Sequence, residues 1–189
     1  MPFKGPFRYP DSPVQYRRLK RPYPKIARGE GVCLHDLDGK SYLDACGGAY
    51  VAALGHGNAV IAEAMASQAR RFGYVNGTQF TSDAAEELAQ ALTERSPGLD
   101  KAFLLANGGD AVEAALKFAR QYWAETGRPE KTKVVSLDPS YHGNTLLALS
   151  AGARAGYKKL FSDWLVDFPR VPAPYPYRSS GPDDPALTG

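Results

Sequence analysis

The chain has 189 residues, 43% of them hydrophobic and 23% charged, and its formal net charge is +3 at pH 7. This composition is typical of an ordinary globular protein with enough residues for one good core. The small charge argues against nucleic-acid binding, because the basic cluster at residues 17–21 is short and interrupted, and no apolar run is long enough to span a membrane.

Residues 1–28 are rich in proline and arginine and show little periodicity, so we expect an extended arm. The first residues of this arm do not resemble a signal peptide. The two cysteines, Cys33 and Cys46, lack the spacing of a metal site and favour reduced thiols over a disulfide framework. These features predict a cytoplasmic protein.

Residues 29–58 are predicted to contain a β-hairpin. Asp38 and Gly39 form a good turn pair between Val32–Leu37 and Ser41–Ala45. A glycine pair and then a polar turn at residues 55–58 follow. We expect His56 in this turn to make hydrogen bonds, and a role as a ligand is the less favoured alternative.

Residues 59–168 alternate between helix and strand patterns. Helices are predicted over Ala59–Phe72 and Asp83–Arg95. Ser82 or Asp83 is the expected N-cap of the second helix, and Glu86, three residues after Asp83, matches a capping box that starts at Asp83.

The most informative segment joins an apolar run, Phe103–Leu105, to a helix pattern that starts at Asp110. One face of this helix is apolar and consists of Val112, Ala115, Leu116, Ala119 and Trp123. Glu113 and Lys117 are predicted to form a favourable i, i+4 pair on another face. The segment therefore indicates a strand followed by a helix.

Asn107, Gly108 and Gly109 lie at this junction. The start of a helix offers unpaired N–H groups and the positive end of a dipole, and glycines let an anion approach the backbone. The junction therefore predicts a phosphate-binding site. A tight turn without a ligand is the alternative, since the segment matches neither the dinucleotide fingerprint nor the P-loop.

A second unit of the same kind follows. Lys133–Leu137 is predicted to be a short strand, Asp138–Asn144 to be a loop, and the run from Thr145 to be helical. A crossover of this length makes the two strands parallel, so both loops should lie at the carboxyl edge of one sheet. The glycine pair and Tyr141-His142-Gly143 would then share one crevice.

These segments resemble the class III pyridoxal-phosphate-dependent aminotransferases, of fold type I. The matching motifs are, in chain order, Asp36–Asp44, Gly47–Gly48, Leu54–Gly57, Ala64, Gln68, Asn107–Arg120 and Tyr141–Gly143. The resemblance covers roughly residues 15–178. It implies an α/β fold, namely an incomplete large domain with a mainly parallel sheet flanked by helices, preceded by a small-domain hairpin.

The same resemblance implies a division of the chain into two segments and a role for its proline-rich end. Residues 1–58 would be the arm and a small-domain segment, and residues 59–189 would be part of the cofactor-binding large domain. Val171–Arg178, in the proline-rich end, would be a loop at the edge of the crevice.

The resemblance also implies pyridoxal 5'-phosphate as cofactor. The backbone N–H groups of Gly108 and Gly109 would bind its phosphate, Tyr141 would stack on the pyridine ring, and His142 would border the ring. For His142, a loop residue held by local hydrogen bonds is an equal alternative. Gly109 departs from the family, which more often has a hydroxyl residue there, and removes one hydrogen bond to phosphate.

Asp110 is a second departure, since it replaces the usual glutamate. Its charge suits the helix dipole but lies near a dianion, so we expect its side chain to turn away.

Two residues that the family's chemistry needs have no match here: the aspartate that faces the pyridine nitrogen and the lysine that forms the Schiff base. We assign no catalytic residue and no metal ligand. The lysines considered and not assigned are Lys101, Lys117, Lys131, Lys133, Lys158 and Lys159, of which the last four are expected in charged, solvated stretches. We therefore expect a transaminase truncated before the Schiff-base lysine and inactive alone.

The implied reaction moves an amino group from an amine or amino acid to a 2-oxo acid, and the full-length parent is expected to be a homodimer. Decarboxylation, aminomutase and racemase chemistries share these motifs and stay open. Two further alternatives are a non-catalytic pseudoenzyme or interaction fragment, and an unrelated phosphate-binding protein on a βαβ frame.

Overall fold

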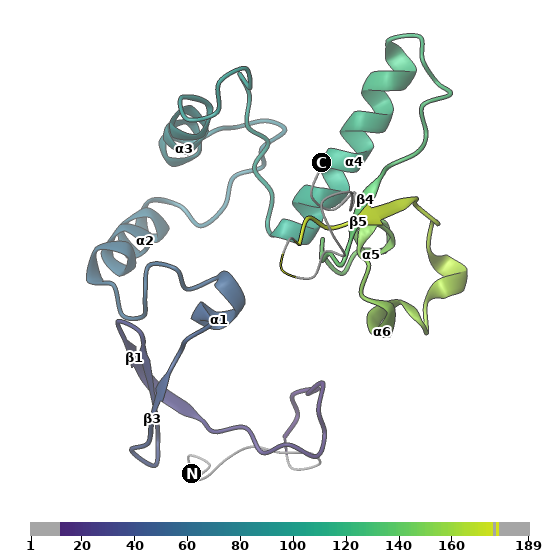
Figure 1. Ribbon diagram of the computed structural model, residues 1–189. Helices are drawn as coiled ribbons and strands as arrows, with labels where there is room; N and C mark the ends of the chain where they lie inside the picture. Colours follow the sequence, from purple (N-terminus) through teal and green to yellow (C-terminus); the bar gives the residue numbers. More distant parts are fainter. Residues whose placement is uncertain (1–11, 176, 178–189) are drawn as a thin grey trace. The chain divides into compact units, whose positions relative to one another are not determined.

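The computed structural model describes residues 12–175 and 177 (Figure 1). The chain divides into two compact units between Thr81 and Ser82, and each unit is described by itself. The domain boundary predicted between residues 58 and 59 stays a prediction. Residues 1–11 of the predicted arm and Pro176 and Arg178 of the predicted edge loop lie outside the described residues.

The first unit contains a three-stranded antiparallel sheet of order β1-β2-β3, formed by Ile26–Glu30, Cys33–Asp36 and Ser41–Leu43. The predicted hairpin is confirmed, because β2 and β3 pair around a turn in which Gly39 has a φ of +83°. Two backbone N–H groups of this turn, those of Asp38 and Lys40, donate to the Asp36 carboxylate at 3.0 and 2.8 Å.

β1 was not predicted. The expectation of an extended arm over residues 1–28 is therefore wrong for residues 26–28, which belong to this strand. The segment has no alternation of apolar and polar residues, and its Arg28 guanidinium donates to the exposed Glu30 carboxylate at 2.7 Å. Pairing with β2 across the turn at Gly31, which has a φ of +54°, makes it a strand. Such a strand is defined by its neighbour rather than by its own pattern.

A short left-handed turn, α1 (Gly47–Tyr50), follows the sheet, with φ of 62° at Ala49 and 70° at Tyr50. The Asp44 carboxylate accepts the N–H of Gly48 at 3.1 Å and lies 2.9 Å from Nε2 of His56. The expectation that His56 makes hydrogen bonds is therefore confirmed. These contacts stabilise a turn whose left-handed backbone conformation residues other than glycine rarely adopt.

Two predicted helices form with local caps. In the first unit, α2 (Ala59–Arg71) begins after Asn58, whose side chain accepts the N–H groups of Val60 and Ile61. In the second unit, α3 (Asp83–Thr93) begins after Ser82, whose hydroxyl accepts the N–H of Ala85 at 3.3 Å. Both predictions are confirmed, with ends one and two residues earlier than expected.

The second unit continues with six elements: α4 (Gly108–Glu125), β4 (Ser136–Asp138), α5 (Leu146–Ala151), α6 (Ala155–Lys158), a 3₁₀ turn η1 (Ser162–Trp164) and β5 (Arg170–Pro172). β4 and β5 are parallel, with Leu137 opposite Val171. Two predictions are wrong in detail. Val171 and Pro172 lie in a strand rather than in a loop, and the predicted strand Phe103–Leu105 has no strand partner among the described residues.

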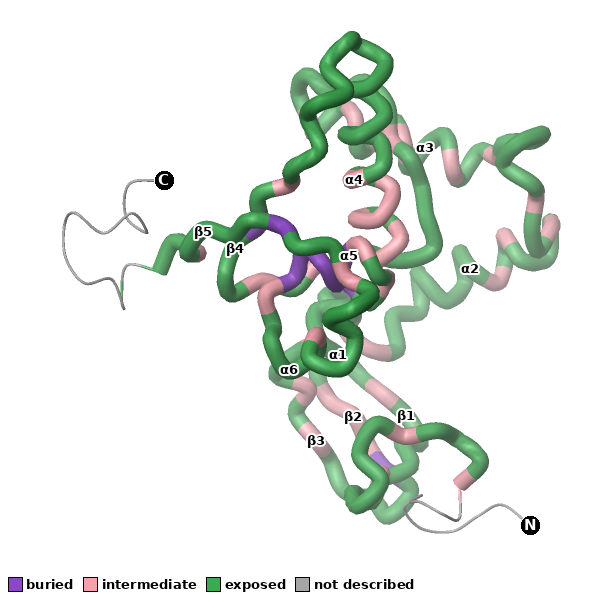
Figure 2. The backbone as a smooth tube through the Cα atoms, turned by 90° about the vertical axis from the view of Figure 1, so that its right-hand side faces the viewer, coloured by how far each residue is buried: buried purple, intermediate pink, exposed green. Residues whose placement is uncertain are grey.

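The buried residues of the second unit gather around α5 and β4, as Figure 2 shows. Among the residues described, the buried apolar ones are Ala148, Leu149, Ala151 and Phe168. Ser136 in β4 and Ser150 in α5 are buried beside them. The part of this small core that α5 contributes follows the loop at residues 139–145 directly, and Ser136 in β4 precedes that loop. No helix in the described part of the chain is long and apolar enough to cross a membrane.

Candidate functional site

α4 begins at the glycine pair because Asn107 caps it. The side-chain oxygen of Asn107 accepts the N–H of Asp110 at 3.0 Å, and its amide donates to the Asp110 carboxylate at 2.7 Å. This reciprocal pair has the logic of a capping box. The helix therefore starts two residues before the predicted start at Asp110. Sequence reasoning missed this role of Asn107, although the Asn-x-x-Asp spacing was a usable signal.

Gly108 and Gly109 occupy the first two positions of this 18-residue helix. N–H groups at these positions have no partner within a helix, and no described residue accepts from them. A methyl group added at Gly108 would meet nothing within 4 Å, so the space where its Cβ would stand is open. At Gly109 a methyl group would lie 3.1 Å from the Asn107 side-chain oxygen and 3.7 Å from the N of Asn144.

The loop that carries Tyr141, His142 and Gly143 lies against this helix start. Gly143 is buried and has a φ of +133°. A methyl group there would lie 2.7 Å from Cα of Gly109 and 3.2 Å from Cβ of Ala148. The structure thus brings the two predicted loops together backbone to backbone, at a point where Gly143 has no room for a side chain and Gly109 has little.

Tyr141 and His142 precede this contact in the same loop. The Tyr141 side chain is exposed, and the Arg154 guanidinium lies 5.4 Å from its ring centroid, a cation–π distance. His142 is half-buried. No local sequence signal pointed to Arg154. The assignment of Gly108, Gly109, Tyr141 and His142 to a cofactor stays a prediction.

Glu113 does not make the predicted surface pair with Lys117. Its carboxylate oxygen Oε2 accepts the Thr145 hydroxyl at 2.6 Å and the N–H of Ala148 at 3.3 Å. Glu113 therefore links α4 to the start of α5. The i, i+4 pattern predicted a local contact, and a tertiary contact replaces it.

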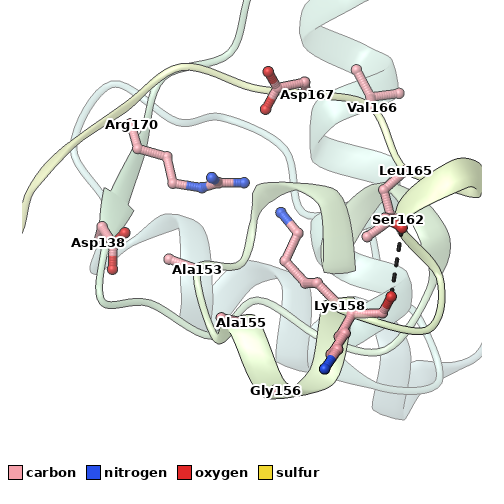
Figure 3. A pocket seen from close by; sticks show the side chains of 11 residues that line it. Asp138, Ala153, Ala155, Gly156, Lys158, Ser162, Leu165, Val166, Asp167 and Arg170 are labelled. Atoms are coloured by element: carbon pink, nitrogen blue, oxygen red, sulfur yellow. Dashed lines mark hydrogen bonds between the residues drawn. The ribbon is translucent and has the colours of Figure 1, made fainter.

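A cavity of about 710 Å³ is lined by residues of α6, η1 and β5 and of the segments next to them (Figure 3). Lys158 and Arg170 are among the side chains that line it, and none of the four predicted site residues does. Size alone would favour this cavity as the binding site. Of the two predicted loops, only Asp138, the first residue of the second loop, lines it, so the cavity does not contain the helix start at the glycine pair.

Lys158 is half-buried rather than solvated, which corrects the expectation for that residue. Its ammonium donates to the carbonyls of Ser150 and Gly152 at 3.0 and 3.1 Å, at the end of α5. Burial lowers the pKa of Lys158, and the nearby Arg170 charge lowers it further. A lysine with a lowered pKa is a candidate for catalysis, but two carbonyl partners at a helix end indicate a structural cap.

Solved transaminase structures share this fold. An omega transaminase from Pseudomonas jessenii in complex with PMP superposes with a TM-score of 0.82 and 27% identity, over 90% of this chain and 40% of that one. The adenosylmethionine-8-amino-7-oxononanoate aminotransferase of Methanocaldococcus jannaschii gives 0.80 and 31%, over 86% and 38%. The fold is that of part of a fold type I transaminase, with a parallel sheet and helices.

The family model for class-III aminotransferases matches residues 15–186, and the chain belongs to this family. A probable aminotransferase of Mycobacterium tuberculosis is 41% identical over 158 residues, which cover 83% of this chain and 34% of that protein. An adenosylmethionine-8-amino-7-oxononanoate aminotransferase of Geobacter sulfurreducens is 39% identical over 166 residues, which cover 87% and 37%. The chain spans little more than a third of the length of these curated relatives.

Proposed function

We propose that the chain acts as part of a pyridoxal-phosphate-dependent transaminase, which moves an amino group from an amine or amino acid to a 2-oxo acid. The observation that carries this proposal is the helix start at Gly108 and Gly109, with two unpartnered N–H groups and the loop of Tyr141 packed against it. Membership of the class III family supports it.

The residues present fit a phosphate group. Asn107 already satisfies the N–H of Asp110, so the two N–H groups before it are left for an anion. Open space lies where a side chain at Gly108 would stand. The positive end of the α4 dipole adds a favourable term for negative charge, typically about 0.3–1 kcal/mol. The Asp110 carboxylate is engaged by the amide of Asn107 rather than free at the site.

Each residue of the site has a distinct role in this proposal. Gly108 and Gly109 bind the phosphate through backbone N–H groups, Tyr141 stacks on the ring, and His142 borders it. When bound, the cofactor supplies an electron sink for the exchange of the amino group. No lysine of this chain is proposed to take part, and Lys158 is held by the end of α5.

We also propose a homodimer in the cytoplasm. The family resemblance supports the dimer, and the free thiols of Cys33 and Cys46 support a reducing compartment.

Ligands that differ only in the phosphate test the proposal. The complete gene product that contains this chain, freed of cofactor, is titrated with pyridoxamine 5'-phosphate and with pyridoxamine by calorimetry. We expect the phosphorylated ligand to bind at least tenfold more tightly, and inorganic phosphate to compete with it. Equal affinities for the two ligands would contradict a phosphate site. Formation of the phosphorylated amine from pyridoxal phosphate and an amino donor then tests the amino transfer itself.

A further inference from the structure

The start of α5 is capped by a residue from another helix. Thr145 occupies the N-cap position of α5, yet its hydroxyl makes no bond to the N–H groups of its own helix. That hydroxyl donates instead to Glu113 at 2.6 Å. The same carboxylate oxygen accepts the N–H of Ala148 at 3.3 Å, and Ala148 is the third residue of α5, where an N-cap side chain ordinarily binds.

Glu113 therefore caps the N-terminus of α5 in place of the Thr145 side chain. A carboxylate at a helix start is favourable because it meets unpaired N–H groups and the positive end of the dipole. Hydrogen bonds to an ionised group are also stronger than those between neutral groups. The bond joins residues 32 positions apart, so it fixes tertiary structure as well as the helix start.

Gly109 and Glu113 stand four residues apart on α4, so they lie on one face of it. That face contacts the loop before α5 at two points: Gly109 packs against the backbone of Gly143, and Glu113 binds Thr145. Two fixed points define the position of a loop much better than one. Tyr141 lies two residues before the first of them, Gly143.

We propose that Glu113 is a positioning residue that sets the distance between the phosphate-binding N–H groups and the ring of Tyr141. This inference rests on the proposed function, since both groups must bind one ligand. Glu113 itself does not touch the ligand in this arrangement. Its effect is confined to ligands that contact both loops.

The test compares a ligand that spans both loops with one that occupies only the helix start. The complete gene product, freed of cofactor, is titrated with pyridoxamine 5'-phosphate and with inorganic phosphate. Glu113→Ala should weaken binding of pyridoxamine phosphate about tenfold, as expected for the loss of a charge-assisted hydrogen bond, and binding of phosphate less than about twofold. Glu113→Gln, which keeps an acceptor oxygen without the charge, should fall between wild type and Ala.

Thr145 supplies a milder pair of variants in case Glu113→Ala does not fold. Thr145→Val keeps the shape and removes the hydroxyl, so it should reproduce the selective loss, and Thr145→Ser should restore the affinity. Glu125→Ala is the matched control, because Glu125 is an exposed glutamate of the same helix that bonds Gln121. It should leave both affinities unchanged.

Two results would overturn the role of Glu113: equal losses for both ligands, or unchanged affinity for pyridoxamine phosphate in Glu113→Ala and Thr145→Val. Failure of the proposed function looks different. In that case the wild-type protein would not distinguish pyridoxamine phosphate from pyridoxamine, and the inference about Glu113 would fall with it.

Discussion

Glycine serves three different purposes where α4 meets the loop of Tyr141. At Gly143 the backbone has a φ of +133° and a methyl group would collide with Cα of Gly109. At Gly109 the space is tight but limited by the flexible end of the Asn107 side chain. At Gly108 an added methyl group would meet nothing within 4 Å outside its own helix turn, so tertiary packing gives no reason for glycine there. A ligand would give one.

This difference makes Gly108→Val a direct test of a phosphate site against a plain turn. Because the added Cβ meets no atom of another element, we expect the free energy of unfolding to change by no more than about 0.5 kcal/mol. Affinity for pyridoxamine phosphate should fall by most of its value, since a branched side chain at the helix start hinders the approach of the phosphate to the N–H groups. Calorimetric titration and urea unfolding on the same preparation provide both numbers. Normal affinity per folded molecule would favour the plain turn.

In contrast to Gly108→Val, Gly143→Ala should mainly lower the stability of the fold. A strained φ and a 2.7 Å approach to backbone together should cost more than about 2 kcal/mol, since each such strain costs about 1–3 kcal/mol. Gly156→Ala is the matched control, because Gly156 lies in α6 with ordinary φ and nothing within 4 Å of its added methyl group. Urea unfolding measures both. Equal stability of the two variants would contradict the close contact between the backbones of Gly143 and Gly109.

At the scale of elements, the chain's own sequence predicts what is decided locally. The Asp38–Gly39 turn and the Ser82 cap of α3 were predicted, and both involve residues within a few positions of one another. The Asn58 cap of α2 is equally local, although the sequence pattern assigned Asn58 only to a polar turn. β1 and β5 could not be predicted in this way, because they are strands only through pairing with β2 and β4. The apolar segment at residues 103–105 shows the converse, a strand pattern without a strand partner in the described part of the chain.

The features of the candidate site likewise separate into those with a local sequence signal and those without one. Glycine and aromatic residues mark its two loops in the sequence, and the resemblance to the family connects them. The bond between Glu113 and Thr145 has no local signature, because the i, i+4 pattern with Lys117 is locally the better pair. Only the packing of α4 on α5 decides between the two partners.

The cap of α4 is predicted to matter for binding as well as for stability. Asn107→Ala removes both bonds of the reciprocal pair and should cost about 1 kcal/mol. It should also weaken binding of pyridoxamine phosphate, because the N–H groups of Gly108 and Gly109 lose their fixed direction. Asn58→Ala removes a comparable cap from α2 and should lower stability without changing ligand affinity. Equal ligand affinities in the two variants would contradict a binding role for the α4 start.

The β2–β3 hairpin should respond to acid through Asp36. The Tyr42 hydroxyl, 2.7 Å from this carboxylate, lowers the pKa of Asp36 below its usual 3.8, helped by the N–H groups of Lys40 and Asp38 and opposed by burial. A lowered folded-state pKa means that the ionised form stabilises the fold. This stabilisation is complete above the unfolded value of 3.8 and is lost as the pH falls through the folded value.

Tyr42→Phe tests this dependence. Without the hydroxyl, the pKa of Asp36 should rise toward its usual value, and the loss of stability below about pH 4 should become shallower. Urea unfolding between pH 2.5 and 6, compared with wild type, measures the difference. Tyr23→Phe is a suitable control, because the Tyr23 hydroxyl contacts a backbone carbonyl rather than a carboxylate. Identical acid profiles for wild type and Tyr42→Phe would exclude the proposed role of the hydroxyl.

At the scale of the whole molecule, the described residues leave much apolar surface exposed. Tyr50 is 92% exposed, Leu160 89% and Val60 80%, and the exposed apolar residues also include Phe103 in the segment before α4. Apolar surfaces of this extent ordinarily face another surface. The buried apolar residues, in contrast, gather in the small core around α5.

We therefore expect the 189 residues expressed alone to be poorly soluble or to form a molten, aggregation-prone state. A small core and many exposed apolar side chains provide little enthalpy to a cooperative transition, so calorimetry should record a broad one. A fully packed protein of this length would unfold sharply, with an enthalpy of about 130 kcal/mol near 60 °C. The dye ANS, which binds loosely packed apolar surface, should fluoresce strongly with the isolated chain. A sharp transition near the full enthalpy, with little ANS binding, would mean that these residues pack into a complete fold by themselves.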